Sequence, residues 1–246
     1  MDIRSSTPES FTDNRPAPSV APMRSDAEKR QEIVVNYSRT RQVRASEREL
    51  VDNRVVTALK DESVIAAYKV LRTRLLQKMK ANRWNALGIT SAHGGEGATL
   101  SAINIAITLA QEMTHSVLLV DFNLKKPGIH RTLGLTPSVG LEHYLFEDMP
   151  LDQILINPGL DRLVILPCTT AIDQASELMT APRVIELVEE LKNRYPNRIV
   201  LFDLPPVLEG DEVLSFSPFI DALLLVVQEN RTTRDDLGLM AELLKG

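Results

Sequence analysis

A short glycine-rich segment constrains the fold of this chain more than any other feature. Residues 92–99 read Ala-His-Gly-Gly-Glu-Gly-Ala-Thr, which follows the spacing of a phosphate-binding P-loop, G-x-x-x-x-G-K-[ST]. Ala92 takes the place of the first glycine, Gly97 that of the second, and Thr99 supplies the hydroxyl that reaches Mg²⁺ in such loops. Ala98 stands where the phosphate-binding lysine belongs. The segment therefore predicts a nucleotide-binding fold with weakened nucleotide chemistry.

The residues on either side of the loop support this interpretation. Residues 86–91 are short and apolar, as a buried parallel strand is. Residues 100–111 carry apolar side chains at helical spacing. A strand, a glycine-rich loop and a helix in this order direct backbone N–H groups and a helix N-terminus toward an anion. The positions predicted to bind a nucleotide cofactor are Gly94, Gly95, Glu96, Gly97, Ala98, Thr99 and Leu100.

Strands and helices are predicted to alternate along the rest of the chain. Continuous apolar runs rich in Val, Leu and Ile predict strands, and segments with helical periodicity lie between or after them. This alternation predicts an α/β fold with a mostly parallel sheet and helices on both faces. The predicted strands are 117–121, 163–167, 199–203 and 222–227, and the predicted helices are 62–81, 182–194 and 233–245.

The chain is predicted to have three parts. Residues 1–45 are polar and lack periodicity, which is typical of a disordered tail. Its basic residues Arg39, Arg41 and Arg44 are interspersed with acidic ones, which favours a solvated tail over a lipid-binding one. Residues 46–85 form a helical segment and residues 86–246 the P-loop domain. The chain stops after a helix, where another strand would be natural, so we expect either a truncated chain or a naturally short one.

Composition excludes several classes of protein. No apolar run approaches the roughly 20 residues that a membrane-spanning helix needs, and the N-terminus lacks a signal-peptide pattern. The single cysteine, Cys168, excludes an intramolecular disulfide and a cysteine-based zinc cluster. A net charge of −5 and an aromatic content of 4% argue against nucleic-acid binding. A cytoplasmic protein is expected.

Two carboxylates are predicted to lie beside the loop. Asp121 and Asp203 each end an apolar strand, and ligands of open parallel sheets bind beyond the carboxyl ends of the strands. Mg²⁺ prefers one or two carboxylates together with phosphate oxygens. We therefore expect Thr99, Asp121 and Asp203 to be metal ligands, with either aspartate also able to act as a catalytic base.

These residues resemble those of a known family. The sequence is similar to the bacterial tyrosine kinases of exopolysaccharide biosynthesis, a group of deviant-Walker P-loop ATPases, and in particular to the tyrosine autokinases encoded with PEP-CTERM/exosortase systems. The likeness runs from about residue 53 to residue 246. It is carried by the segments 90–99, 102–106, 117–127 and 195–206, and more weakly by 67–73 and 176–179.

The resemblance implies a site, cofactors and partners. It implies that residues 95–97 belong to the phosphate loop and that Thr99, Asp121 and Asp203 are metal or catalytic positions. ATP or ADP with Mg²⁺ is the implied cofactor. The implied partners are a membrane chain-length determinant (a polysaccharide co-polymerase) and further kinase subunits, which would hold the chain at the cytoplasmic face of the inner membrane.

The sequence departs from this family at several functional positions. Besides Ala98, Asn123 replaces the second acid of the family's D-x-D element. The E-x-x-R-x-x-R pattern of its oligomerisation helix reads Ala66, Lys69 and Arg72, and a lysine lacks the bidentate fork of an arginine. The family's C-terminal tyrosine cluster has no counterpart among the four tyrosines, Tyr37, Tyr68, Tyr144 and Tyr195.

Two functional hypotheses follow. The first is a degenerate family member that regulates or scaffolds exopolysaccharide biosynthesis with weak or no phosphotransfer, because loss of a preorganised charge at the phosphates slows transfer strongly. The alternative is an active tyrosine autokinase or ATPase whose phosphate site uses another cation. Lys125 and Lys126 are candidates for that cation, as is a protonated His93.

Overall fold

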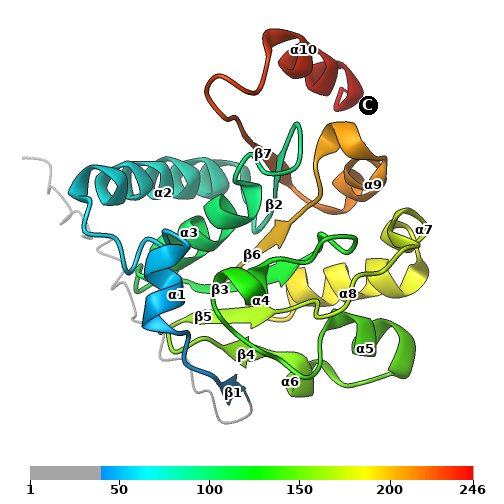
Figure 1. Ribbon diagram of the computed structural model, residues 1–246. Helices are drawn as coiled ribbons and strands as arrows, with labels where there is room; N and C mark the ends of the chain where they lie inside the picture. Colours follow the sequence, from blue (N-terminus) through cyan, green and yellow to red (C-terminus); the bar gives the residue numbers. More distant parts are fainter. Residues whose placement is uncertain (1–39, 246) are drawn as a thin grey trace, which may run out of the picture. The chain divides into compact units, whose positions relative to one another are not determined.

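The computed structural model describes residues 40–245, which form a seven-stranded sheet in the order β1-β4-β5-β3-β6-β2-β7 (Figure 1). Neighbouring strands are parallel except for β4 and β5. The strands are β1 (Arg41–Gln42), β2 (Ala86–Ser91), β3 (Ser116–Asp121), β4 (Ile156–Asn157), β5 (Leu163–Leu166), β6 (Arg198–Asp203) and β7 (Ala222–Val226).

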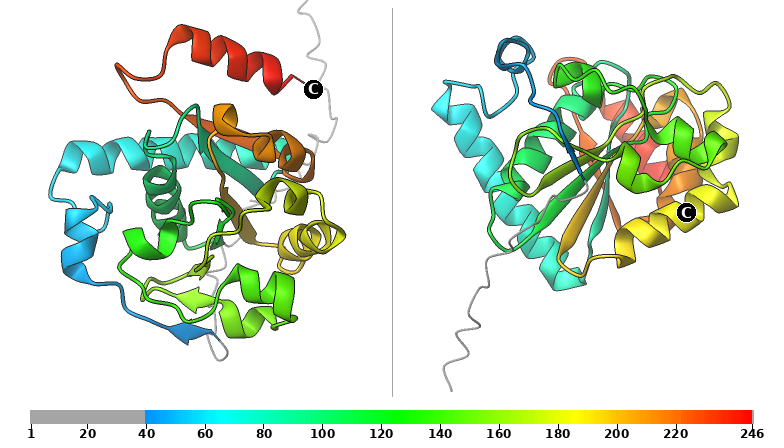
Figure 2. Two further views of the ribbon diagram at one scale, coloured as in Figure 1. Left: turned by 45° about the vertical axis from the view of Figure 1, so that its right-hand side comes forward. Right: turned by 90° about the horizontal axis from the view of Figure 1, so that it is seen from below.

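Helices cover both faces of this sheet (Figures 1 and 2). One face carries α2 (Glu62–Asn82) packed over α3 (Ala98–Ala110), and the other carries α8 (Pro182–Asn193) with α7 (Ala175–Met179) and α9 (Glu212–Phe216) beside it. The remaining helices are α1 (Glu47–Asp52), α4 (Ile129–Thr132), α5 (Leu141–Glu147), α6 (Leu151–Ile154) and α10 (Arg234–Leu243), with 3₁₀ turns η1 (Val207–Glu209) and η2 (Ser217–Phe219).

Helix α3 is enclosed between the sheet and α2. Every residue from Ala102 to Ala110 is buried, because the sequence is rich in Ala and Ile and offers apolar surface on all sides, as a fully covered helix requires. Arg72 of α2 fastens the outer helix, since its guanidinium forms an ion pair with Glu112 at 3.0 Å and a bond to the Thr108 carbonyl. The helix that begins at the glycine-rich loop is therefore held rigidly by the core.

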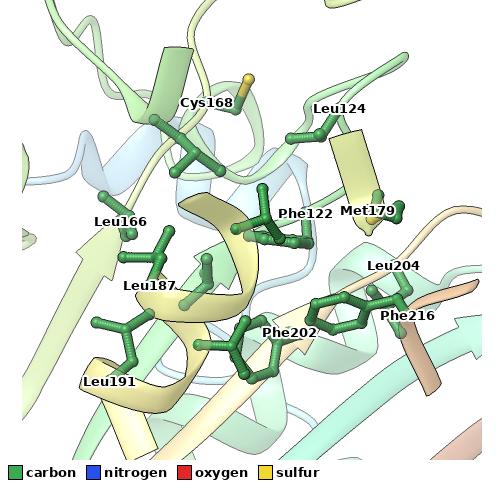
Figure 3. Packing of buried hydrophobic residues seen from close by; sticks show 14 of the residues in the cluster. Phe122, Leu124, Leu166, Cys168, Met179, Leu187, Leu191, Phe202, Leu204 and Phe216 are labelled. Atoms are coloured by element: carbon green, nitrogen blue, oxygen red, sulfur yellow. The ribbon is translucent and has the colours of Figure 1, made fainter. Parts of the chain in front are cut away.

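The opposite face is filled by an aromatic cluster (Figure 3). Phe122, Phe202 and Phe216 are fully buried, with ring centroids 4.7–5.4 Å apart. Phe122 follows the acidic end of β3 by one residue, and Phe202 precedes that of β6 by one residue. Because side chains alternate across a strand, burying these rings fixes the directions of Asp121 and Asp203 next to them.

The predicted α/β fold is confirmed, and the predicted strands and helices are present with ends shifted by at most two residues. The predicted tail is outside the described residues up to position 39, but its boundary near residue 45 is wrong. Arg41 and Gln42 pair with Ile156 and Asn157 as strand β1, and Val43 donates to the Asn157 carbonyl at 2.9 Å. In the part of the chain that the structure describes, no helix combines the length and the apolar character needed to span a bilayer.

Candidate phosphate and metal site

Two buried aspartates lie side by side at the carboxyl edge of the sheet. Asp121 ends β3 and Asp203 ends β6, and the parallel register places them directly opposite each other. The Phe122 N–H donates to the Asp203 carbonyl at 2.9 Å, which continues the ladder one residue past the pair. Both side chains are fully inaccessible to solvent.

The carboxylates of this pair are only partly satisfied. Oδ2 of Asp121 accepts hydrogen bonds from the backbone N–H groups of Gly128 and Ile129, both at 3.0 Å. Among the described residues, Oδ1 of Asp121 and both side-chain oxygens of Asp203 have no hydrogen-bond partner with ordinary geometry. Buried polar atoms almost always have partners, so three free carboxylate oxygens in one place indicate room for a cation.

Burial and mutual repulsion make the two carboxyls hard to ionise without such a cation. Desolvation raises the pKa of Asp121 to about 7, although the N–H groups of Ile129 and Gly128 oppose that rise. Desolvation and the charge of Asp121 raise the pKa of Asp203 well above its usual value, and the Thr99 hydroxyl partly offsets this rise. Like charges that share a buried site typically behave in this way.

Thr99 connects the acid pair to the glycine-rich loop. Its side chain packs against Gly128, where an added Cβ would stand 3.4 Å from Cγ2 and 3.8 Å from Oγ1 of Thr99. Gly128 is also the residue whose N–H binds Asp121. The structure thus brings together Thr99, Asp121 and Asp203, as the sequence predicted.

This donor set suits Mg²⁺ bound together with phosphate. Two carboxylates and a hydroxyl are hard oxygen ligands, and Mg²⁺ completes its coordination with water and phosphate oxygens. Among the described residues, no group of three or more His, Cys, Asp or Glu side chains forms a metal site by itself. These three residues therefore fit a Mg²⁺ ion whose remaining ligands are water and the phosphate oxygens of a nucleotide.

The loop itself has the backbone of an anion site. Gly95 and Gly97 have φ angles of +81° and +89°, a region that glycine enters without steric cost. The backbone N–H groups of residues 95–99 have no acceptor within the described chain. Unpaired N–H groups at a helix N-terminus attract anions, so the backbone of this loop has the arrangement of an anion site.

Glu96 braces the loop from within and is nearly buried. Its carboxylate accepts from the His93 N–H at 3.0 Å and from the Thr232 hydroxyl at 2.8 Å. His93 also lies 3.2 Å from Asp236 of α10. The loop is thereby fastened to the segment that connects β7 with α10.

Charged residues from distant segments also contact the loop. The Gly94 N–H donates to Glu209 at 2.5 Å, and Glu209 lies 3.6 Å from the Lys126 ammonium. Arg231 donates to the carbonyls of Gly94 and Gly95 at 2.7 and 3.3 Å. The carboxylate of Glu209 therefore contacts the first glycine of the loop, and the guanidinium of Arg231 contacts the first two.

Comparison with known proteins shows which proteins this chain resembles. No protein-family model matches the chain. The tyrosine-protein kinase YwqD of Bacillus subtilis (strain 168) is 28% identical over 177 residues, covering 72% of this chain and 73% of YwqD. The tyrosine-protein kinase CpsD of Streptococcus agalactiae is 26% identical over 188 residues, 76% of this chain and 79% of CpsD.

Solved structures agree with these relatives. The kinase domain of VpsO superposes with a TM-score of 0.64 at 25% identity, covering 74% of this chain and 91% of that domain. The BceF tyrosine kinase domain gives a TM-score of 0.67 at 25% identity, covering 84% of this chain and 78% of that domain. These matches show that the chain is similar, over about three quarters of its length, to the bacterial tyrosine kinases of capsule and exopolysaccharide biosynthesis.

The proteins that the chain resembles differ in length and in described role. The succinoglycan biosynthesis transport protein ExoP of Rhizobium meliloti (strain 1021) is 29% identical over 160 residues, which is 63% of this chain but 20% of ExoP. The septum site-determining protein MinD of Pyrococcus horikoshii, in complex with Mg-ADP, shares the fold with a TM-score of 0.53 at 23% identity over 64% of this chain and 65% of MinD.

The sequence did not point to several residues that contact the loop. Glu209, Arg231, Thr232 and Asp236 all reach the loop from more than 100 positions away, and no local pattern marks them. Cys168 is fully buried, and burial raises the pKa of its thiol, so this residue packs in the core.

The two lysines predicted as substitute cations each face a carboxylate. Lys125 forms an ion pair with the buried Glu212 of α9, and Lys126 lies beside Glu209. A buried carboxylate left without a partner is costly, which holds Lys125 away from the loop. In the described chain, neither lysine forms an ion pair or a hydrogen bond with residues 93–99.

Proposed function

We propose that this chain acts in exopolysaccharide biosynthesis and export as a regulator or scaffold with weak or no ATP phosphotransfer. The observation that supports the proposal is Ala98, which opens α3 at the end of an otherwise well-formed phosphate loop. Phosphoryl transfer depends on charge stabilisation around the transferred group. Loss of a preorganised donor at such a site slows the reaction by about 10²–10³-fold, and losing a full charge costs at least as much.

The metal side of the site supports retention of a ligand. Thr99, Asp121 and Asp203 would hold Mg²⁺ when a nucleotide carries it in, and the metal would then neutralise charge on the phosphates. Asp121 and Asp203 are also the two candidate catalytic residues, either of which could act as a base. With Asn123 in place of a second acid after β3, the site binds and orients more readily than it activates an acceptor hydroxyl.

The wider role follows from the family. We propose a membrane chain-length determinant and other kinase subunits as partners, which would keep the chain at the cytoplasmic face of the inner membrane. Among subgroups, the PEP-CTERM/exosortase-associated autokinases are the proposed relatives. Arg72 supports a changed oligomerisation helix, because its guanidinium is bound to Glu112 and Thr108 of its own chain.

Autophosphorylation with γ-labelled ATP and Mg²⁺ tests this proposal. We expect label incorporation by the full chain to match that of Asp203→Ala, which removes a metal ligand. Robust incorporation that Asp203→Ala abolishes would contradict the proposal and establish the alternative, an active autokinase with a rearranged phosphate site.

A further inference from the structure

The loop has Ala98 in place of its lysine, but the guanidinium of Arg231 contacts it. Arg231 lies on the connection between β7 and α10, and its two terminal nitrogens donate to the carbonyls of Gly94 and Gly95 at 2.7 and 3.3 Å. These carbonyls belong to the first turn of the phosphate loop. The guanidinium therefore lies directly against the segment that is predicted to enclose phosphates.

The charge of Arg231 is not neutralised by these contacts. Both of its partners are uncharged carbonyls, and within residues 40–245 Arg231 forms no ion pair with a carboxylate. Lys125 and Lys126, by contrast, face Glu212 and Glu209. A guanidinium has five N–H donors in a planar fork that matches phosphate, and Arg231 is exposed with donors to spare.

The surrounding residues hold Arg231 in place. Thr232 next to it binds Glu96 inside the loop, and the Thr232 hydroxyl oxygen accepts from the Gln228 N–H at 3.0 Å. Room for the guanidinium depends on Gly95, where a Cβ would stand 3.2 Å from Nη1 of Arg231. The connection is thus tied to the loop by the residue that directly follows the arginine.

We propose that Arg231 supplies the positive charge that Ala98 removes, so that residues 94–99 still bind the terminal phosphates of a nucleoside di- or triphosphate. This inference rests on the proposed function only in taking the loop as a phosphate site. A second observation supports a ligand here, because among the described residues neither side-chain oxygen of the fully buried Asp203 has a hydrogen-bond partner with ordinary geometry. Charge supplied from outside the loop preserves binding without restoring the acid lost at Asn123.

Glu209 competes with a phosphate for one N–H group of the loop. Its carboxylate holds the Gly94 N–H, which is one of the donors that a phosphate would use. A bound phosphate therefore has to compete with Glu209 for that amide, and Arg231 on the carbonyl side of the same residue favours the phosphate. Lys126 at 3.6 Å offsets part of the negative charge of Glu209.

Calorimetric titration of the full chain with Mg-ADP tests the inference. Arg231→Gln keeps a hydrogen-bond donor but loses the charge, and we expect it to weaken binding by about ten- to a hundredfold, the range of one or two charge-assisted hydrogen bonds. Arg231→Lys keeps the charge and should stay within about tenfold of wild type. Arg234→Gln, an exposed neighbour at the start of α10, is the matched control and should change nothing.

Three results would overturn the inference: wild type that does not bind Mg-ADP, Arg231→Gln that binds as wild type does, or an equal loss in Arg234→Gln. The double variant Ala98→Lys/Arg231→Gln gives an independent check, since a lysine inside the loop should restore the lost affinity if charge is what matters. Thermal unfolding of each variant confirms the fold. The γ-labelled ATP assay separates the two proposals, because absent phosphotransfer with Arg231-dependent binding supports both, and phosphotransfer that needs Arg231 contradicts only the scaffold role.

Discussion

The two sides of the candidate site are built in different ways. On the metal side, Asp121 and Asp203 are buried at the ends of adjacent strands and backed by three packed phenylalanines. On the phosphate side, the loop is more open and is held by polar contacts from Glu209, Arg231 and Thr232. The core maintains the first side, whereas the second depends on individual side chains. The phosphate side can therefore change while the fold and the buried pair of aspartates persist.

The largest expected effect is on the stability of the protein, when a phenylalanine packed behind the metal side is removed. Phe202→Ala removes a fully buried ring that packs at 5.4 Å from Phe122 and 5.2 Å from Phe216. We expect the free energy of unfolding to fall by about 3–5 kcal/mol. Chemical denaturation measures it, with Val227→Ala, which is 50% exposed, as a control that should change stability by less than about 0.5 kcal/mol. Equal losses in both variants would contradict the contrast between the two sides.

The buried carboxylates predict a second effect, on pH dependence. Because burial raises the pKa of Asp121 from 3.8 to about 7, the folded protein holds a proton that the unfolded chain releases. Stability of the metal-free protein should therefore fall as pH rises from about 4 to about 7. Asp121 contributes at most about 1.4 kcal/mol for each pH unit, and Asp203, whose pKa is also raised, adds to the fall.

Asp203→Asn and Mg²⁺ sharpen this second prediction. Asp203→Asn removes one of the two like charges, so it should stabilise the metal-free protein above this pH window and flatten its pH profile. Millimolar Mg²⁺ should partly stabilise the wild-type protein and flatten its pH profile, because it binds the ionised pair. Chemical denaturation in EDTA at about pH 4 and about pH 7 measures the change in the free energy of unfolding. If that free energy changes equally with pH in wild type and Asp203→Asn, the two carboxyls do not form a coupled pair.

Much of this contrast was readable from the sequence. Apolar runs predicted the central strands, and because parallel strands end at one edge, Asp121 and Asp203 were expected to meet beside Thr99. The two-residue strands β1 and β4 were missed, since two residues give no periodicity. The charged neighbours of the loop were also missed, because Arg231 and Glu209 are exposed residues whose partners lie 115–137 positions away.

A third prediction concerns Lys125, whose partner is the nearly inaccessible Glu212. Lys125→Ala leaves that carboxylate unpaired and should lower the free energy of unfolding by about 1–3 kcal/mol. Because Lys125 does not bind the loop, Mg-ADP affinity should stay within about twofold. Unfolding and titration of the same sample separate these effects, and a tenfold loss of affinity would reassign Lys125 to the phosphate side.

The smallest expected effect is at Glu209, which holds an amide of the loop. Glu209→Gln keeps the shape of the side chain and removes its charge, so a phosphate competes against a weaker acceptor. We expect Mg-ADP affinity to rise by about three- to tenfold. Titration checks it, with Glu229→Gln as an exposed acidic control. Weaker binding in Glu209→Gln would show that Glu209 supports the loop instead of competing for it.

Within a fold that persists, the phosphate side, where Ala98 replaces the lysine, is expected to limit phosphotransfer. The most direct test is Mg²⁺-dependent phosphotransfer from ATP by wild type and Ala98→Lys, each compared with the same chain carrying Asp203→Ala. Wild type is predicted to match its Asp203→Ala counterpart, and Ala98→Lys to bind Mg-ATP more tightly and gain turnover that depends on Asp203. Wild type that already turns over in an Asp203-dependent way, with no gain from Ala98→Lys, would contradict the account.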